Sequence, residues 1–169
     1  MRARILAVAA AVAAWGCENA AAPRPGQTGS CTAVLSGALT GTWDCRPAYT
    51  QFDSATGLSD FGFDLPASGT RPAIFVAVEW VGVPMVATYS SADSGASASL
   101  LVTSSGNQWS ADVGSGSPVG SYQLTLTSVA KNGVTSGGLA YRTDGSLTAT
   151  LPAAAGTGAS GTINLSVTF

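Results

Sequence analysis

The chain has 169 residues, with seven basic and nine acidic side chains, and it contains no histidine. This length fits a single domain. The absence of histidine excludes Ser-His-Asp and Cys-His catalysis and removes the commonest general base at neutral pH. The basic residues form no cluster that could follow a phosphate backbone, so nucleic acid is not an expected partner.

The first 16 residues have the layout of a secretory signal peptide. Arg2 and Arg4 precede an apolar run over residues 5–16, and small side chains stand near the end of that run. The run is too short for a stable transmembrane helix, which needs roughly 20 apolar residues. We therefore expect a signal-peptide helix over residues 1–16 that is removed after export.

The residues at the expected cleavage point are Ala14, Trp15, Gly16 and Cys17. They resemble the lipobox of bacterial lipoproteins, in which a small residue precedes an invariant cysteine. This resemblance covers residues 1–17. It implies that a diacylglyceryl group is attached to the Cys17 thiol, that cleavage makes Cys17 the first residue, and that the new amino terminus is acylated by a fatty acid such as palmitate. The alternative is an ordinary signal peptide that is cut within residues 20–22, which would discard Cys17.

Residues 17–30 are expected to form the lipidated amino terminus and a flexible tether. The segment is rich in proline, glycine and small residues and has almost no large apolar side chain. It therefore cannot bury enough apolar surface to offset the conformational entropy lost on folding. In lipoproteins of enteric type, Asp after the cysteine favours inner-membrane retention, so Glu18 favours the outer membrane. We expect a cell-envelope protein whose lipid anchor binds the membrane and whose domain covers residues 31–169.

Cys31 and Cys45 bracket a predicted β-hairpin. A hairpin centred on Ala38 places Cys31 opposite Cys45 and Ala33 opposite Trp43, which gathers the apolar side chains on one face. Opposed strand residues lie within the distance that a disulfide needs. A zinc site would need further Cys or His ligands, and a redox pair would favour CxxC spacing. The spacing therefore predicts a structural disulfide.

The rest of the chain repeats a pattern of short strands separated by turns. Apolar and polar residues alternate with a period of two in four segments. These segments are residues 98–102, 122–126, 147–151 and 163–169. Residues 73–80 are apolar on both faces and are predicted to be a central strand, while Asn132-Gly133 and Asp144-Gly145 are predicted to be tight turns.

This pattern predicts an all-β domain. We expect an antiparallel β-sandwich of about eight to ten strands, with a closed β-barrel as the alternative. The expected core includes Trp43, Phe75 or Val76, Leu124, Leu126, Ile163 and Leu165. Phe169 is expected to hold the last strand in the sheet.

Carboxylates are the remaining candidates for catalysis. Asp53, Asp60 and Asp64 are expected to cap turns and solubilise a long loop, with calcium binding as an alternative. Glu79, beside Trp80, is expected to be partly buried. It could pair with an arginine (Arg71 or Arg142), or act as an acid of raised pKa.

Trp80 and Trp109 are candidates for stacking on a sugar ring, although tryptophans of a chain this poor in large side chains also serve to fill the core. No catalytic residue, cofactor or metal site is predicted. The expected function is a non-enzymatic binding or structural module that recognises a glycan or an envelope protein. The alternative is a surface-attached glycoside hydrolase that uses carboxylates.

Overall fold

The computed structural model describes residues 31–169 apart from 46–48, 94–95, 113–118 and 136–137. The expected signal peptide, Cys17 and the tether over residues 17–30 lie outside the described residues. In the described part of the chain, no helix has the length and apolar character needed to cross a bilayer.

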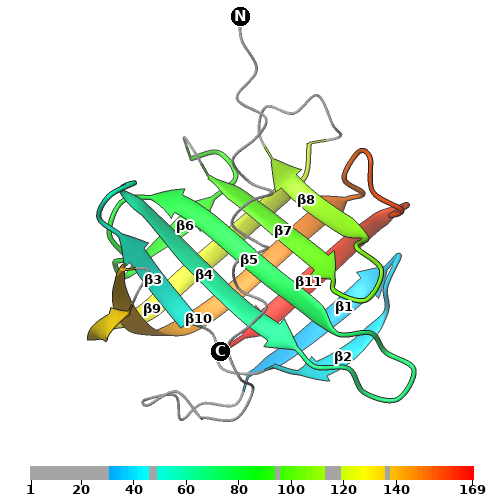
Figure 1. Ribbon diagram of the computed structural model, residues 1–169, viewed down its shortest axis with the longest axis horizontal. Coiled ribbons are helices and arrows are strands. Elements are labelled where there is room, and N and C mark those ends of the chain that lie inside the picture. Colours follow the sequence, from blue (N-terminus) through cyan, green and yellow to red (C-terminus); the bar gives the residue numbers. More distant parts are fainter. Residues whose placement is uncertain (1–30, 46–48, 94–95, 113–118, 136–137) are drawn as a thin grey trace, which may run out of the picture.

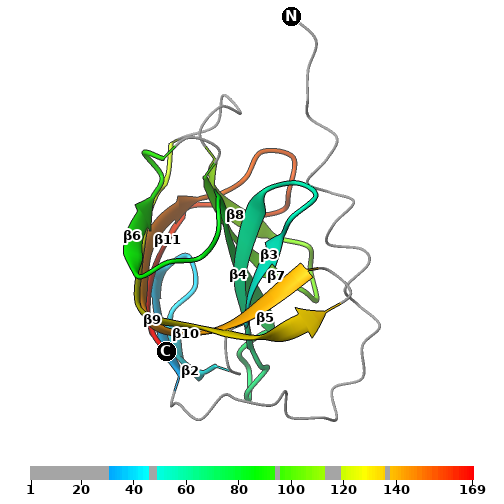
Figure 2. The same cartoon turned by 90° about the vertical axis from the view of Figure 1, so that its left-hand side faces the viewer.

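The described residues form eleven antiparallel strands in one hydrogen-bonded sheet that folds over into two facing layers (Figures 1 and 2). The expectation of an antiparallel β-sandwich is confirmed, with one strand more than the expected range. The path of the sheet through the described residues remains open, because it ends at β2 and β8.

The first layer contains the strands nearest to both ends of the described chain. Its strands are, in spatial order, β6 (Ala87–Ser90), β9 (Ser121–Thr135), β10 (Gly138–Pro152), β11 (Thr162–Thr168), β1 (Thr32–Gly37) and β2 (Gly41–Asp44). The second layer continues from β10 through β3 (Tyr49–Asp53), β4 (Leu58–Leu65), β5 (Ile74–Val81), β7 (Ser97–Val102) and β8 (Gln108–Asp112). Strand β5 lies between β4 and β7, so its predicted central position is confirmed.

The long β9–β10 hairpin belongs to both layers. Residues 146–152 of β10 pair with β11, whereas residues 139–141 pair with β3. The β9–β10 register shifts twice along the way, between Ala140 and Tyr141 and between Asp144 and Gly145. Such bulges bend a strand pair and increase its twist, which lets the hairpin pass from one layer to the other.

These register shifts correct two predicted turns. Asn132-Gly133 lies inside β9 and Asp144-Gly145 lies inside β10, so neither dipeptide closes a tight hairpin. Both stand where the register changes, since Gly133 pairs with Ala140 just before the first shift and Gly145 follows the second shift. A side chain at Gly145 would collide with the Thr125 carbonyl oxygen. Glycine is therefore required here for close approach of two strands, and not for a turn.

The core lies between the layers and follows the predicted alternation. The predicted members Trp43, Val76, Leu124, Leu126, Ile163 and Leu165 are all buried. Of the two candidates on β5, Val76 points into the core, and Phe75 is half-buried on the outer face. The Phe169 ring packs 4.5 Å from the Phe61 ring, and its backbone exchanges two hydrogen bonds with Gly145, so the last strand is held as expected.

Candidate functional site

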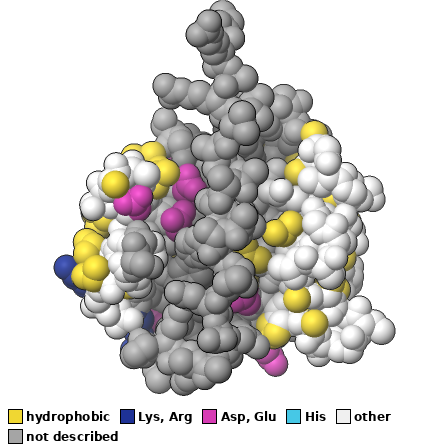
Figure 3. Space-filling view, in the orientation of Figure 1, with side chains coloured by type: hydrophobic (Ala, Val, Ile, Leu, Met, Phe, Trp, Pro, Cys, Tyr) yellow, Lys and Arg dark blue, Asp and Glu magenta, His cyan; other side chains and the backbone are white. Residues whose placement is uncertain are grey.

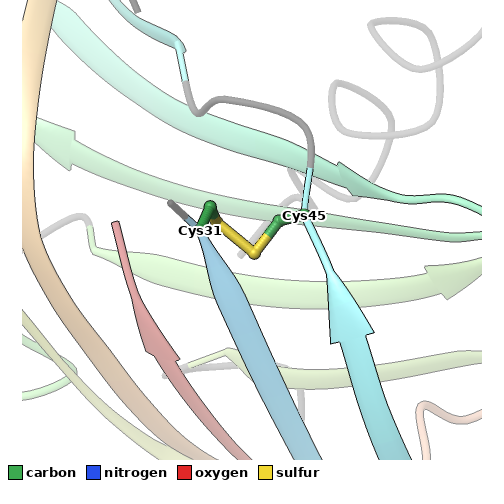
Figure 4. The surroundings of a disulfide bond; sticks show 2 residues. All are labelled: Cys31 and Cys45. Atoms are coloured by element: carbon green, nitrogen blue, oxygen red, sulfur yellow. A yellow bond between two sulfur atoms is a disulfide. The ribbon is translucent and has the colours of Figure 1, made fainter. Parts of the chain in front are cut away.

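Cys31 and Cys45 form the predicted disulfide at the open end of the β1–β2 hairpin (Figure 4). Their Cα atoms lie 5.0 Å apart, and the Cys45 N–H donates a hydrogen bond to the Cys31 carbonyl. The predicted register is also confirmed, because Ala33 pairs with Trp43. The bond joins the edge strand β2 to its neighbour β1 and stabilises the fold by restricting the unfolded chain.

Trp80 and Trp109 fill the core, which corrects the suggestion that they stack on a ligand. Their exposed fractions are 1% and 3%. Trp80 of β5 packs against Tyr89 of β6, at 4.6 Å between ring centres, and thus links the two layers. The Trp109 indole N–H donates to the Ser160 carbonyl. Neither ring presents a face to solvent, because each strand directs its large apolar side chains inward.

The three aspartates of the predicted loop lie on the β3–β4 hairpin instead. Asp53 caps the turn as expected: its carboxylate accepts hydrogen bonds from the Ala55 N–H, at 2.8 Å, and from the Thr56 hydroxyl, at 2.9 Å. Asp60 and Asp64 belong to β4, so the expectation of a loop is wrong for them. Four residues of extended strand separate these two carboxyls by roughly 13 Å. The described residues contain no group of three or more His, Cys, Asp or Glu side chains suited to hold a metal ion.

Asp60 meets Glu79 on the outer face of the second layer. The two residues are directly opposed on β4 and β5, and a hydrogen bond joins their half-buried carboxyl groups. Figure 3 shows acidic side chains at separate places on this side of the molecule. Arg71, one of the two arginines considered as a partner for Glu79, lies over the Trp43 ring, at 5.3 Å from its centre.

The environment raises the pKa of both carboxyl groups. Burial is the main cause, since it disfavours the charged form. The negative charge of Asp53 further raises the pKa of Asp60, and that of Asp60 further raises the pKa of Glu79. The hydrogen bond between the two groups opposes the rise in pKa for Asp60 and adds to it for Glu79. Asp53 shows the opposite behaviour, because the Ala55 N–H and the Thr56 hydroxyl lower its pKa.

This arrangement does not match the carboxyl pair of a glycoside hydrolase. Such enzymes hold an acid and a base, or a nucleophile, at least about 5 Å apart on either side of the scissile bond. Asp60 and Glu79 lie side by side on neighbouring strands and bond to each other. A sugar linkage has no room between two carboxyl groups that are hydrogen-bonded to each other. The pair is better suited to couple the stability of the sheet to pH.

The outer face of the first layer has a different character, which we call the hydroxyl face. Its side chains alternate with core residues along six paired strands, and they are mainly exposed, short and uncharged. The hydroxyl and amide side chains are Thr32, Ser36, Thr42, Thr88, Ser90, Ser121, Gln123, Thr125, Ser146, Thr148, Thr150, Asn164, Ser166 and Thr168. Val34 interrupts the surface on β1, and Asp44 lies at its edge on β2.

An open hollow of ≈ 420 Å³ lies on the hydroxyl face over β9, β10 and β11. Its polar lining consists of Ser121, Gln123, Thr148, Thr150 and Asn164. Gln123 is directly opposed to Thr148, and the Thr150 hydroxyl donates a 3.0 Å hydrogen bond to the Asn164 side-chain oxygen. The alternation in these strands is visible in the sequence, but alternation does not specify that the three strands are neighbours.

Comparisons with protein-family models, curated proteins and solved structures give no match for this chain. The two outer faces of the domain differ in their chemistry. One face presents a pair of half-buried carboxyl groups whose pKa values are raised, and the other presents a broad uncharged surface with a hollow.

Proposed function

We propose that this protein is a non-enzymatic binding module of the cell envelope, anchored in the outer membrane through a lipid on Cys17. The chain has three cysteines, and the disulfide uses Cys31 and Cys45. That pairing leaves Cys17 as the one thiol for modification. Cys17 directly follows an apolar run, and residues 14–17 resemble a lipobox. This allocation of the cysteines is the observation that carries the proposal.

Two features support binding as the role of the domain. The hydroxyl face offers many exposed donors and acceptors on a rigid sheet, which is a suitable support for recognition. The competing proposal, a surface-attached glycoside hydrolase, would need two carboxyl groups on opposite sides of a substrate. Asp60 and Glu79 give it no support, because they bond to each other.

Mass spectrometry of the mature protein, purified from membranes of a host that processes lipoproteins, tests the anchor. We expect an amino terminus at Cys17 that carries acyl chains, since several chains together hold a protein firmly in a bilayer. The Cys17→Ser variant should lose the lipid and leave the membrane fraction. The Cys31→Ser/Cys45→Ser variant is the matched control, because it also removes cysteines but should keep the lipid.

An unmodified amino terminus between residues 18 and 25 would overturn the anchoring proposal. So would a Cys17→Ser variant that stays in the membrane fraction to the same extent as the wild-type protein.

A further inference from the structure

We infer that the hollow on the hydroxyl face is a binding site for an uncharged polysaccharide. The inference deepens the proposed function, since it rests on the domain being a binding module and names the class of its ligand. It depends on the side chains around the hollow, and not on the lipid.

The charge of the site selects a neutral ligand. None of the residues that line the hollow is charged. The neighbours Ser146, Ser166 and Thr168 continue the uncharged surface along β10 and β11. A charged ligand would lose hydration there without gaining an ionic partner, which is unfavourable. Nucleic acids and anionic lipids are therefore poor candidates.

The available hydrogen-bonding groups select a ligand rich in hydroxyl groups. Around the hollow, β10 is paired on both sides, with β9 and β11, while β11 also pairs with β1 and Gln123 of β9 also pairs with Ser90 of β6, so a peptide strand finds no free edge there. Side chains alone remain for recognition. The hydroxyls of Thr148 and Ser121 and the amide of Gln123 both donate and accept, as sugar hydroxyls do.

The repeat of the surface selects a polymer. Neighbouring strands place these side chains about 4.8 Å apart, and alternate residues of one strand lie roughly 7 Å apart. The same groups therefore recur across the sheet beyond the hollow, from Gln123 and Thr148 to Ser166. A chain of sugar units can cross the open hollow and contact these rows, whereas a single small molecule would leave them unused.

A second surface competes with this site. Val81, Val83, Met85 and Val86 are exposed on β5 and the β5–β6 connection. These apolar side chains would suit a protein or lipid, and they have no groups with which to bind sugar hydroxyls. A variant in this loop therefore distinguishes the two surfaces.

Affinity electrophoresis of the full chain in mild detergent tests the inference. The gels contain hydroxyethyl cellulose, galactomannan or dextran as neutral probes, or polygalacturonate as an anionic probe. We expect at least one neutral polysaccharide to retard the protein, equally at low and high salt because no ion pair is involved. Polygalacturonate should not retard it.

Variants locate the site. Gln123→Leu/Thr148→Val removes two hydrogen-bonding groups from the hollow and should weaken binding about tenfold or more. Thr32→Val is the matched control: Thr32 is exposed on the same face, but it lies outside the hollow and off the row that joins Gln123, Thr148 and Ser166, so binding should be unchanged. Thermal unfolding of each variant confirms that it is folded.

Three results would overturn the inference: no retardation by any neutral probe, equal loss of binding in the hollow and control variants, or loss only in Met85→Ser/Val86→Ser. Release of reducing ends from the probes would contradict the non-enzymatic function instead. An acylated Cys17 in a protein that binds none of the neutral probes would refute the ligand class and leave the anchor intact.

Discussion

At the scale of single residues, Asp60 and Glu79 are the two groups whose protonation most directly affects the fold. Both are half-buried, and their pKa values are raised mainly by that burial. The folded protein therefore holds their protons more tightly than the unfolded chain does. Their contribution to stability is complete below about pH 4 and is lost as the pH rises through the raised pKa values.

Glu79→Gln should remove much of this pH dependence, because glutamine keeps a donor for Asp60 and carries no charge. The melting temperature of the wild-type protein should fall between about pH 4 and pH 7, and that of the variant should fall less over the same range. At neutral pH the variant should be the more stable protein. Melting curves followed by circular dichroism over this range measure both effects.

Asp64→Asn provides the comparison, since Asp64 lies on the same strand but is exposed and opposes Phe75. It should leave the pH profile of the wild type unchanged. If Glu79→Gln and the wild type show parallel profiles, the pair does not control the stability of the sheet. Asp53 adds an effect of opposite sign, because its lowered pKa gives stability that is lost as the pH falls below its normal titration range.

The sequence predicted some of these residues for a clear physical reason and missed others. The register between Cys31 and Cys45 could be derived, because the two strands are adjacent in sequence and one alignment buries Trp43. The partner of Glu79 could not, because burial patterns do not specify which strands will pair. Trp80 and Trp109 were ambiguous, since a large aromatic side chain suits both a core and a sugar site.

At the scale of elements, the β9–β10 hairpin shows why turn dipeptides alone are a weak guide. Asp-Gly and Asn-Gly are favoured in tight turns, but glycine is equally needed where two backbones approach closely. The structure places Gly145 beside the Thr125 carbonyl, within a continuous strand. The existence of the strands could be predicted from the alternation of apolar and polar residues. The positions of the bulges could not, because they depend on contacts between strands that the alternation does not specify.

Gly145→Ala should destabilise the domain by about 1–3 kcal/mol, because the added methyl group would force β9 and β10 apart. Urea unfolding measures the change in the free energy of unfolding. Ser146→Ala is the matched control, since the next side chain along β10 is exposed and its loss should have little effect. Equal stability of the two variants would show that the strands can separate at this point without cost.

At the scale of the whole molecule, strand β10 makes the two layers one cooperative unit. It pairs with β11 in the first layer and with β3 in the second. Unfolding of either layer therefore also breaks hydrogen bonds that hold β10 in the other layer. The Trp80–Tyr89 contact adds a link through the core. The sandwich class was predictable from strand number and alternation, but this sharing of one strand was not.

A single unfolding transition should therefore be observed. Tryptophan fluorescence, which reports on the core, and far-ultraviolet circular dichroism, which reports on the strands, should give the same midpoint in urea. Reduction of the disulfide should lower that midpoint without splitting the transition, by an amount equivalent to about 3 kcal/mol. Two separated midpoints in the oxidised protein would show that the layers unfold independently.

The pairing of β1 with β11 has a consequence for how the protein is made. These strands stand near opposite ends of the described chain, so β1 lacks one neighbour until β11 has been synthesised. Contacts between such distant segments slow folding. The β1–β2 hairpin can form early, but the β11 position beside β1 remains vacant meanwhile, and chaperones would have most to protect during this interval.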